Sequence, residues 1–369
     1  MIFKIDKSCL DAINNKDRDS IIALDDLASN RRKGKNFIFA EKSVLEALYK
    51  ADISEGAKQV FYSLFSKSSE DKLYLQAVNK YINVVDKVIE PQIGKNGNKE
   101  EFKVELKSLK DSDIYDYTVL ITENQNDSEF YKLIGKYYAR SKNIIKSKIM
   151  FDPKPGGGDT TVKILSVTVN NATKKLCLCI VDSDKKFPKD TGGDTKKHIE
   201  KFIKEHPVQD IWKVIILDVH EIENLLPISY IEKCSKDVST SSNTIKFLNH
   251  LISSYPIPEA IFYFDMKDGI KKEKFICKNP NNSEIQKKFN ENANFRYYWH
   301  NYVISYGINI NTVSSEHIIN GIGKKILEKI IKEFSSQEIS LEKDDYLKDK
   351  WISLGRDIFS WGCVGDRIN

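Results

Sequence analysis

The stretch Tyr117-Thr-Val-Leu-Ile-Thr-Glu123 is the first of three apolar runs that decide the fold, and each of them ends in acidic residues. The second is Leu176-Cys-Leu-Cys-Ile-Val-Asp-Ser-Asp184. The third is Val214-Ile-Ile-Leu-Asp218, followed by His220-Glu-Ile-Glu-Asn-Leu-Leu-Pro227. Short runs rich in Val and Ile, separated by helix-sized intervals, are typical of buried parallel strands. Functional sites in proteins with open α/β sheets lie beyond the carboxyl ends of the strands, so these acids are the first candidates for site residues.

Length and composition bound the class of protein. A chain of 369 residues predicts two or three domains, and an apolar fraction of 40% allows a sizeable core. The net charge of +5 is compatible with a polyanionic partner but does not require one. The six cysteines form no C-x-x-C pair, which argues against a zinc site. No signal peptide and no apolar run long enough to cross a bilayer are evident, so we expect a cytoplasmic protein without a membrane partner.

The chain is predicted to be an α/β protein in three ranges. Residues 1–105 alternate strand and helix patterns, residues 106–235 hold the three acidic strands in a mostly parallel sheet, and residues 236–369 are mixed and mainly helical. In the first range the strands end near Asp6, Glu41 and Asp86, an order that resembles PIN-like ribonuclease domains in topology. A cap or partner-binding domain explains the same pattern.

Three local interpretations accompany this division. The polar stretch 95–101, with its glycine, is interpreted as an interdomain linker. A strand at 148–151 is followed by the loop 152–160, which contains two prolines and three glycines. The apolar run 260–269 is interpreted as a strand that leads into a turn.

The spacing of the acids predicts a metal site. In an extended strand, Asp182 and Asp184 point to the same side, and two carboxylates this close repel each other unless a cation lies between them. Oxygen ligands of this kind suit Mg²⁺, with Mn²⁺ as the alternative. Glu123, at the end of another strand, could hold a second metal or act as a general base.

A glutamate on one strand, an Asp-x-Asp on a later strand and the β/α alternation between them resemble the TOPRIM domain, especially that of the OLD-like, defence-associated nucleases. The resemblance covers roughly residues 110–230 and implies a Rossmann-like domain that hydrolyses phosphodiesters. It assigns the family's acidic positions to Glu123, Asp127, Asp182, Asp184 and Glu223, with Asn224 completing a Glu-Asn turn. The chain departs from the family in two ways: Asn124 follows the first glutamate in place of the usual Gly, and no Gly-x-x-x-x-Gly-Lys-Ser/Thr loop is present.

Several further residues are candidates. Asp218 is a reserve metal ligand, and Lys267 could stabilise the charge that develops on a phosphate. Four basic residues could contact nucleic acid without reading its sequence: Arg31, Arg32, Lys154 and Lys185. Solvated surface charge explains the same basic pattern. The aromatic stretch 295–300 either stacks on unpaired bases or forms core.

These observations predict a nuclease dependent on Mg²⁺ (or Mn²⁺) that cleaves DNA or RNA, with a role in defence against phage. Catalysis is assigned to Glu123, Asp182, Asp184, Glu223 and Lys267. A separate ATPase or sensor subunit is the expected partner, and an oligomer is compatible with the sequence. Two alternatives stay open: a primase- or topoisomerase-like enzyme with the same acids, and a catalytically idle sensor or regulatory subunit.

Overall fold

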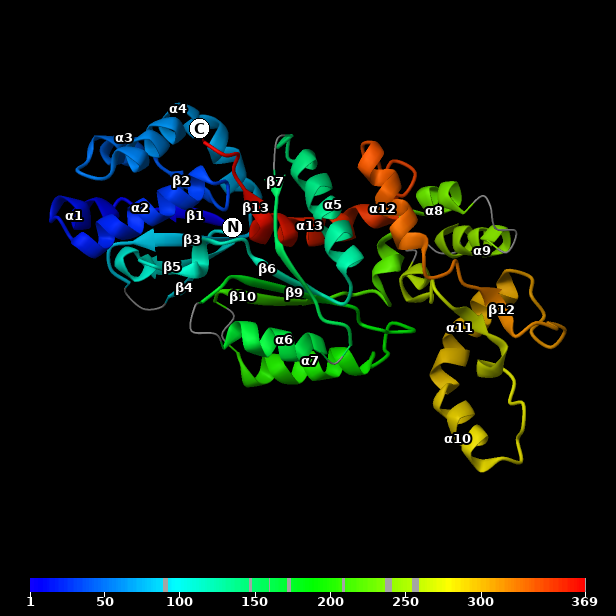
Figure 1. Ribbon diagram of the computed structural model, residues 1–369. Helices are drawn as coiled ribbons and strands as arrows, with labels where there is room; N and C mark the ends of the chain where they lie inside the picture. Colours follow the sequence, from blue (N-terminus) through cyan, green and yellow to red (C-terminus); the bar gives the residue numbers. More distant parts are fainter. Residues whose placement is uncertain are drawn as a thin grey trace. The chain divides into compact units, whose positions relative to one another are not determined.

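The computed structural model describes residues 1–88, 92–145, 148–158, 160–170, 174–207, 210–235, 241–253 and 259–368 (Figure 1). It is a mixed α/β structure with mainly parallel sheets, as predicted. Two compact units divide it. Unit 1 comprises Met1–Ile180, Phe202–Ile215 and Trp351–Asn369; unit 2 comprises Val181–Lys201 and Ile216–Lys350. Both units are discontinuous in sequence, whereas the prediction divides the chain into three continuous ranges.

The first sheet of unit 1 has five strands in the order β2-β1-β3-β5-β4. Their bounds are β1 Ile2–Ile5, β2 Phe37–Ala40, β3 Lys80–Val85, β4 Ile93–Asn96 and β5 Lys99–Glu105. β1 is parallel to β2 and β3, and β3 is parallel to β5. The predicted alternation of strands and helices is therefore confirmed in this region.

Helices connect these strands, and two of them begin with a side-chain cap. The helices are α1 Cys9–Asn14, α2 Arg18–Arg32, α3 Lys42–Lys50 and α4 Glu55–Ala77, and the short helices η1 Leu106–Leu109 and η2 Asp113–Tyr115 follow the sheet. The side chain of Asp17 accepts a hydrogen bond from Ser20 N at the start of α2, and Ser54 does the same for Ala57 N at the start of α4. Such caps satisfy backbone donors that a helix leaves free.

The interdomain linker predicted at 95–101 is wrong. β4 and β5 form an antiparallel hairpin, in which Asn96 is paired with Lys99 across a two-residue loop. Gly97 in that loop has φ of 62°, a left-handed conformation that glycine adopts without strain. The Asn-Gly-Asn sequence that indicated a linker is thus a hairpin turn.

The second sheet has the order β10-β9-β6-β8. Its strands are β6 Val119–Thr122, β8 Asp152–Pro155, β9 Cys177–Val181 and β10 Trp212–Ile216, connected by α5 Gln125–Ser141, α6 Thr160–Val169 and α7 Asp194–Glu205. β6 is parallel to β8 and β9, which confirms the predicted parallel strands. Cys177 N donates to Ile211 O and Leu217 N donates to Val181 O, so β10 also runs parallel to β9. α5 and α6 lie on opposite faces of the sheet (Figure 1).

β8 lies within the range that was predicted to be a loop. Pro153 and Pro155 argued against a strand, because proline cannot donate to a sheet ladder. β8 is an edge strand, however, and an edge strand has one side on which no donor is needed. The predicted strand before it is shortened to β7, Lys148–Ile149. Asp159 lies outside the described residues.

The helix α13, Lys348–Gly362, returns late in the chain to complete unit 1, followed by β13, Cys363–Val364, which pairs with β7. Glycines allow α5 and α13 to approach closely. A Cβ on Gly135 would lie 2.8 Å from Ile358, and one on Gly355 would lie 2.6 Å from Tyr138. The Trp351 ring also packs edge-on against Phe130.

Unit 2 is mainly helical in the part that the structure describes. Its elements are η3 Ile222–Leu225, α8 Ile228–Cys234, α9 Ser241–Ser253, η4 Ala260–Tyr263, β11 Gly269–Lys271, η5 Lys272–Lys274, α10 Ser283–Glu291, α11 Ala293–Ser305, β12 His317–Asn320, α12 Ile326–Ser336 and η6 Asp345–Leu347. The strand predicted at 260–269 is wrong, since its apolar residues form η4. A short run that is buried on all sides does not distinguish strand from helix by its periodicity.

Candidate functional site

Two of the predicted acids follow neighbouring strands of the second sheet. Glu123 follows β6, and Asp182 follows β9. The strands are parallel, with Ile121 opposite Cys179, so both end at the same edge of the sheet. Glu123 is half-buried and belongs to unit 1, whereas Asp182 is buried and belongs to unit 2. Their convergence on one metal ion stays a prediction.

The backbone changes direction between Asp182 and Asp184. β9 ends at Val181, and Asp184 has φ of 53°, so the rule that i and i+2 face the same side does not hold here. Gly193 packs against this segment: its N–H donates to Ser183 O at 3.0 Å, and a Cβ on it would lie 2.0 Å from Asp184 Oδ2. A strained backbone of this kind is often found at functional sites.

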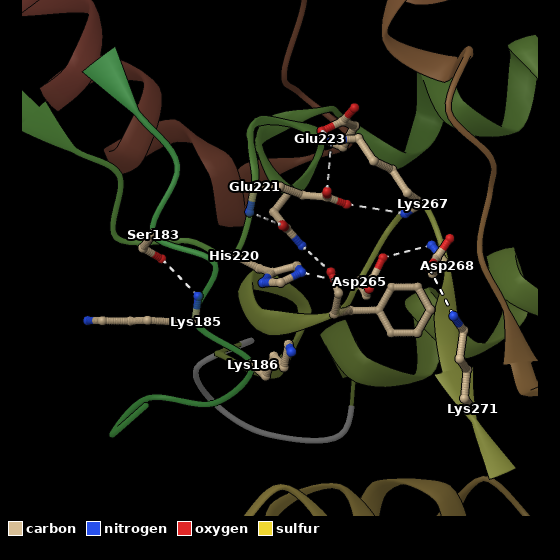
Figure 2. A network of polar contacts seen from close by, with 12 residues as sticks. Ser183, Lys185, Lys186, His220, Glu221, Glu223, Asp265, Lys267, Asp268 and Lys271 are labelled. Carbon is tan, nitrogen blue, oxygen red and sulfur yellow. Dashed lines mark hydrogen bonds and ion pairs between the residues drawn. The ribbon is translucent and has the colours of Figure 1, made fainter. Parts of the chain in front are cut away.

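A buried histidine and two carboxylates lie together in unit 2 (Figure 2). His220, Glu221 and Asp265 each offer a ligand atom, and these atoms all lie within 4.8 Å of one another. Backbone bonds hold the cluster: His220 N donates to Phe262 O at 2.7 Å, and Asp184 N donates to His220 O at 2.8 Å. The segments after β9, β10 and η4 therefore meet in this cluster, which we call the acid–histidine cluster.

Lys267 neutralises two glutamates beside this cluster. Its Nζ lies 2.9 Å from Glu221 Oε2 and 3.1 Å from Glu223 Oε2, and its N–H donates to Glu221 Oε1 (Figure 2). Burial acts to lower the pKa of Lys267, but the two carboxylates outweigh it and raise this pKa. Burial and repulsion from Glu223 raise the pKa of Glu221 to about 7, although Lys267 and His220 oppose them. Glu221 can therefore change its protonation near neutral pH.

His220 and Asp265 stabilise each other's charged forms. Burial acts to lower the pKa of His220, but Asp265, whose Oδ2 lies 3.9 Å from His220 Nε2, and the charge of Glu221 outweigh it, so this pKa is raised. Burial acts to raise the pKa of Asp265, but the nearby His220 and the Asp268 N–H lower it. His220 Nδ1 is buried and has no hydrogen-bond partner in the part of the chain that the structure describes.

Asn224 positions the Glu-Asn turn rather than offering a ligand. Its Nδ2 donates to Ile261 O and Phe264 O, both at 2.8 Å, and its Oδ1 accepts from Glu221 N at 2.9 Å. These bonds tie η3 to the segment that carries Asp265. Glu223, 3% exposed, is held inside the turn with its carboxylate towards Lys267.

Two predicted metal ligands have other contacts in the structure. Asp127 caps α5, because its carboxylate accepts from Asn124 N at 2.8 Å. Asp218 is exposed and lies 3.7 Å from Lys185 Nζ and 3.8 Å from Lys350 Nζ. A ligand role for either residue is a prediction that these contacts do not favour.

The predicted nucleic-acid contact by Arg31 is contradicted by its burial. Arg31 is 6% exposed, donates to Asp366 O and stacks over the Phe37 ring, so it holds the chain after β13 against α2. Arg32 and Lys154 are exposed, and Lys185 is half-buried. For these three, contact with nucleic acid stays a prediction.

Asp265, Glu221 and His220 were not among the predicted site residues. Asp265 is far from the other two in the chain, and the apolar run before it forms η4 rather than the strand that was expected. The useful signal was the acid that directly follows this apolar run, because the other candidate acids have the same context.

No protein-family model matches the chain, no curated protein matches it, and no solved structure matches it. Among the described residues, none of the helices is both long and apolar enough to pass through a membrane. A functional assignment therefore has to rest on the chemistry of the site itself.

Proposed function

We propose that this protein is a divalent-metal-dependent nuclease of the TOPRIM type, similar to the OLD-like branch, that hydrolyses phosphodiester bonds of DNA or RNA. The observation that carries the proposal is that Asp184, which follows β9, is bonded through its backbone to His220, which follows β10. Residues that follow the neighbouring strands β9 and β10 are thus joined, and Lys267 contacts Glu221 beside them. The carboxyl edge of a parallel sheet is where α/β enzymes carry their functional residues.

The donor set fits a hard divalent cation. Asp182 and Asp184 would hold one ion, and Glu221, Asp265 and His220 supply two carboxylates and an imidazole for another. His220 Nδ1 is a buried polar atom without a partner among the described residues. An imidazole beside carboxylates suits Mn²⁺ better than Mg²⁺. When bound, such ions stabilise the charge on the attacking and leaving oxygens of a phosphodiester.

The chain's own residues supply charge and a proton site. Lys267 is 31% exposed and carries its charge next to Glu221, so it can approach a phosphate oxygen without leaving the cluster. Glu221, whose pKa is about 7, can accept or release a proton at Oε2 near neutral pH. Asn224 and Gly193 keep the acids in place.

The test is a cleavage assay on plasmid DNA, single-stranded DNA and total tRNA, each with Mg²⁺, with Mn²⁺ and with EDTA. We expect cleavage that needs metal and that falls at least ~100-fold in Asp182→Asn, because the carboxylate charge is lost while the shape is kept. The matched control is Asp194→Asn, on a carboxylate that is 83% exposed on α7 and lies 3.1 Å from Lys197.

Two results would contradict the proposal. One is cleavage that continues undiminished in Asp182→Asn or in EDTA. The other is wild-type protein that neither cleaves a substrate nor binds Mn²⁺ by calorimetry.

A second function is favoured by the Lys267 contacts. Its ammonium already neutralises Glu221 and Glu223, as a metal ion would, which suits an idle sensor or regulatory subunit. Absence of divalent-metal binding by calorimetry distinguishes this function from a nuclease. We propose an ATPase or sensor subunit as its partner in phage defence.

A further inference from the structure

A cavity lined by lysines lies in unit 2, and Lys186, one of its lining residues, directly follows Lys185, a predicted nucleic-acid contact. Its volume is about 480 Å³, and it is formed by the segment after β9, by η5 with the residues that follow it, and by α10. Four lysines line it: Lys186, Lys274, Lys278 and Lys288. We call it the lysine cavity.

Two glutamates, Glu273 and Glu291, also line the lysine cavity, so its positive charge is partly balanced. Lys278 lies 3.9 Å from Glu273, and Lys288 lies 3.2 Å from Glu284. Lys186 and Lys274 make no ion pair with a carboxylate among the residues that the structure describes. The pKa of Lys274 is lowered by burial and then by the charge of Lys186, and Asp265 only partly opposes this. Two like charges held together in this way favour a bound anion.

The aromatic helix α11 holds both lysines in place. Trp299, 1% exposed, donates from Nε1 to Lys186 O at 2.9 Å. Lys274 Nζ lies 4.7 Å from the centre of the Phe295 ring, and Arg296 donates to Lys274 O. Phe295 and Trp299 of the aromatic stretch 295–300 are therefore core residues, as one of the two interpretations predicted, and they also position the lysines.

The lysine cavity is close to the candidate site in sequence and interacts with it electrostatically. Lys186 comes two residues after Asp184, whose N–H donates to His220 O. The carboxylate of Asp265 acts on Lys274 as well as on His220. An anion in the cavity would thus be adjacent to the place where a phosphodiester is expected to be cleaved.

We propose that the lysine cavity binds a backbone phosphate of the polynucleotide, next to the phosphate that is cleaved. This inference rests on the proposed function and names the strand contact of the same site. The ligand is larger than a free phosphate, because the cavity has the size of pockets that hold small organic molecules, and Ile285 and Phe289 offer apolar surface for a sugar or base. Lysines bind phosphates without reading sequence, so DNA and RNA are both accepted.

The experiment measures binding of a fluorescein-labelled single-stranded 20-mer, as DNA and as RNA, by anisotropy in EDTA, where no cleavage is expected. The double variant K186A/K274A should bind ~10-fold or more weakly, and its dependence on salt should be shallower by ~1.4 in slope, because two phosphate contacts are lost. The variant K186R/K274R keeps the charges and should bind within ~3-fold of wild type. Lys332→Ala is the matched control, since Lys332 is 75% exposed and pairs with Glu328 on α12.

Competition identifies the source of the phosphate. Inorganic phosphate and AMP should displace the 20-mer only at concentrations ~100-fold or more above those at which an unlabelled 20-mer does. The proposal is overturned if K186A/K274A, folded by circular dichroism, binds with wild-type affinity and salt slope, or if AMP competes as well as the 20-mer. Since binding is measured without metal, loss of cleavage alone would contradict the proposed function and leave this inference standing.

Discussion

Lys267 shows how one side chain decides the state of a cluster of acids. Its ammonium contacts two carboxylates that are almost completely buried, Glu221 and Glu223, and a buried charge without a partner is strongly unfavourable. A divalent cation could supply the same neutralisation. The lysine and a metal ion therefore compete for Glu221, and the effect of removing the lysine should depend on metal.

We expect Lys267→Met to lower the free energy of unfolding by about 3 kcal/mol, because two buried carboxylates lose their partner. Added Mn²⁺ should then raise the melting temperature of the variant more than that of wild type. Lys271→Met is the matched control: its side chain is equally exposed, at 31%, but its partner Asp268 is itself exposed. Thermal melts with and without MnCl₂ measure both effects. Equal losses in the two variants would contradict the role of Lys267.

At the residue scale, the sequence could indicate candidate acids but not the residues that contact them. Asp182 and Asp184 follow an apolar run, and Glu223 was assigned by the resemblance to the TOPRIM domain. Asp265 joins His220 only through the path of the chain around η4, which no local pattern contains. The burial of Arg31 was equally unpredictable, because it depends on the residues after β13.

Helices and strands were predictable where their periodicity was strong. They were mispredicted where proline, glycine or asparagine occurs in a strand or a hairpin turn and was interpreted as a loop or a linker. β6, β9 and β10 were found because continuous apolar runs of this length are typical of covered strands. β8 was missed because its prolines are tolerated only at an edge, and edge position is a property of the whole sheet. The β4–β5 hairpin was missed because its turn also has the composition of a linker.

The hairpin offers a matched pair of glycines. A Cβ at Gly94 or at Gly97 would meet nothing within 4 Å, but only Gly97 has a positive φ, of 62°. We expect Gly97→Ala to lower the free energy of unfolding by about 1 kcal/mol, and Gly94→Ala to leave it unchanged or slightly higher. Urea denaturation of both variants tests this. If the two substitutions have the same effect, backbone strain is not what selects glycine at position 97.

Across the whole molecule, the second sheet depends on a helix that the chain supplies more than a hundred residues later. Trp351 packs against Phe130 and Tyr137, and Gly355 packs against Tyr138 on α5. The prediction divided the chain into continuous ranges, because nothing in the local sequence indicates that α13 packs back on α5. The amphipathic pattern of α13 does not identify the helix against which it packs.

The packing of α13 on α5 leads to a prediction about fragments of the chain. We expect residues 106–235 alone, the range predicted as a catalytic domain, to lack a sharp thermal transition, because the apolar face of α5 would be open to water. Appending residues 346–364 through a flexible linker should restore cooperativity at least in part. Circular dichroism melts of both fragments measure this. A sharp transition for 106–235 alone would contradict it.

The packing of α13 and β13 also determines when the protein can finish folding during its synthesis. The N-terminal amino group of Met1 donates to Trp361 O and Cys363 O, and Thr118 Oγ1 donates to Trp361 O. Strands β1 and β6 are thus completed by residues that are synthesised long after them. Until then, unit 1 would be present with apolar surface open, and a chaperone would have its longest opportunity to bind there.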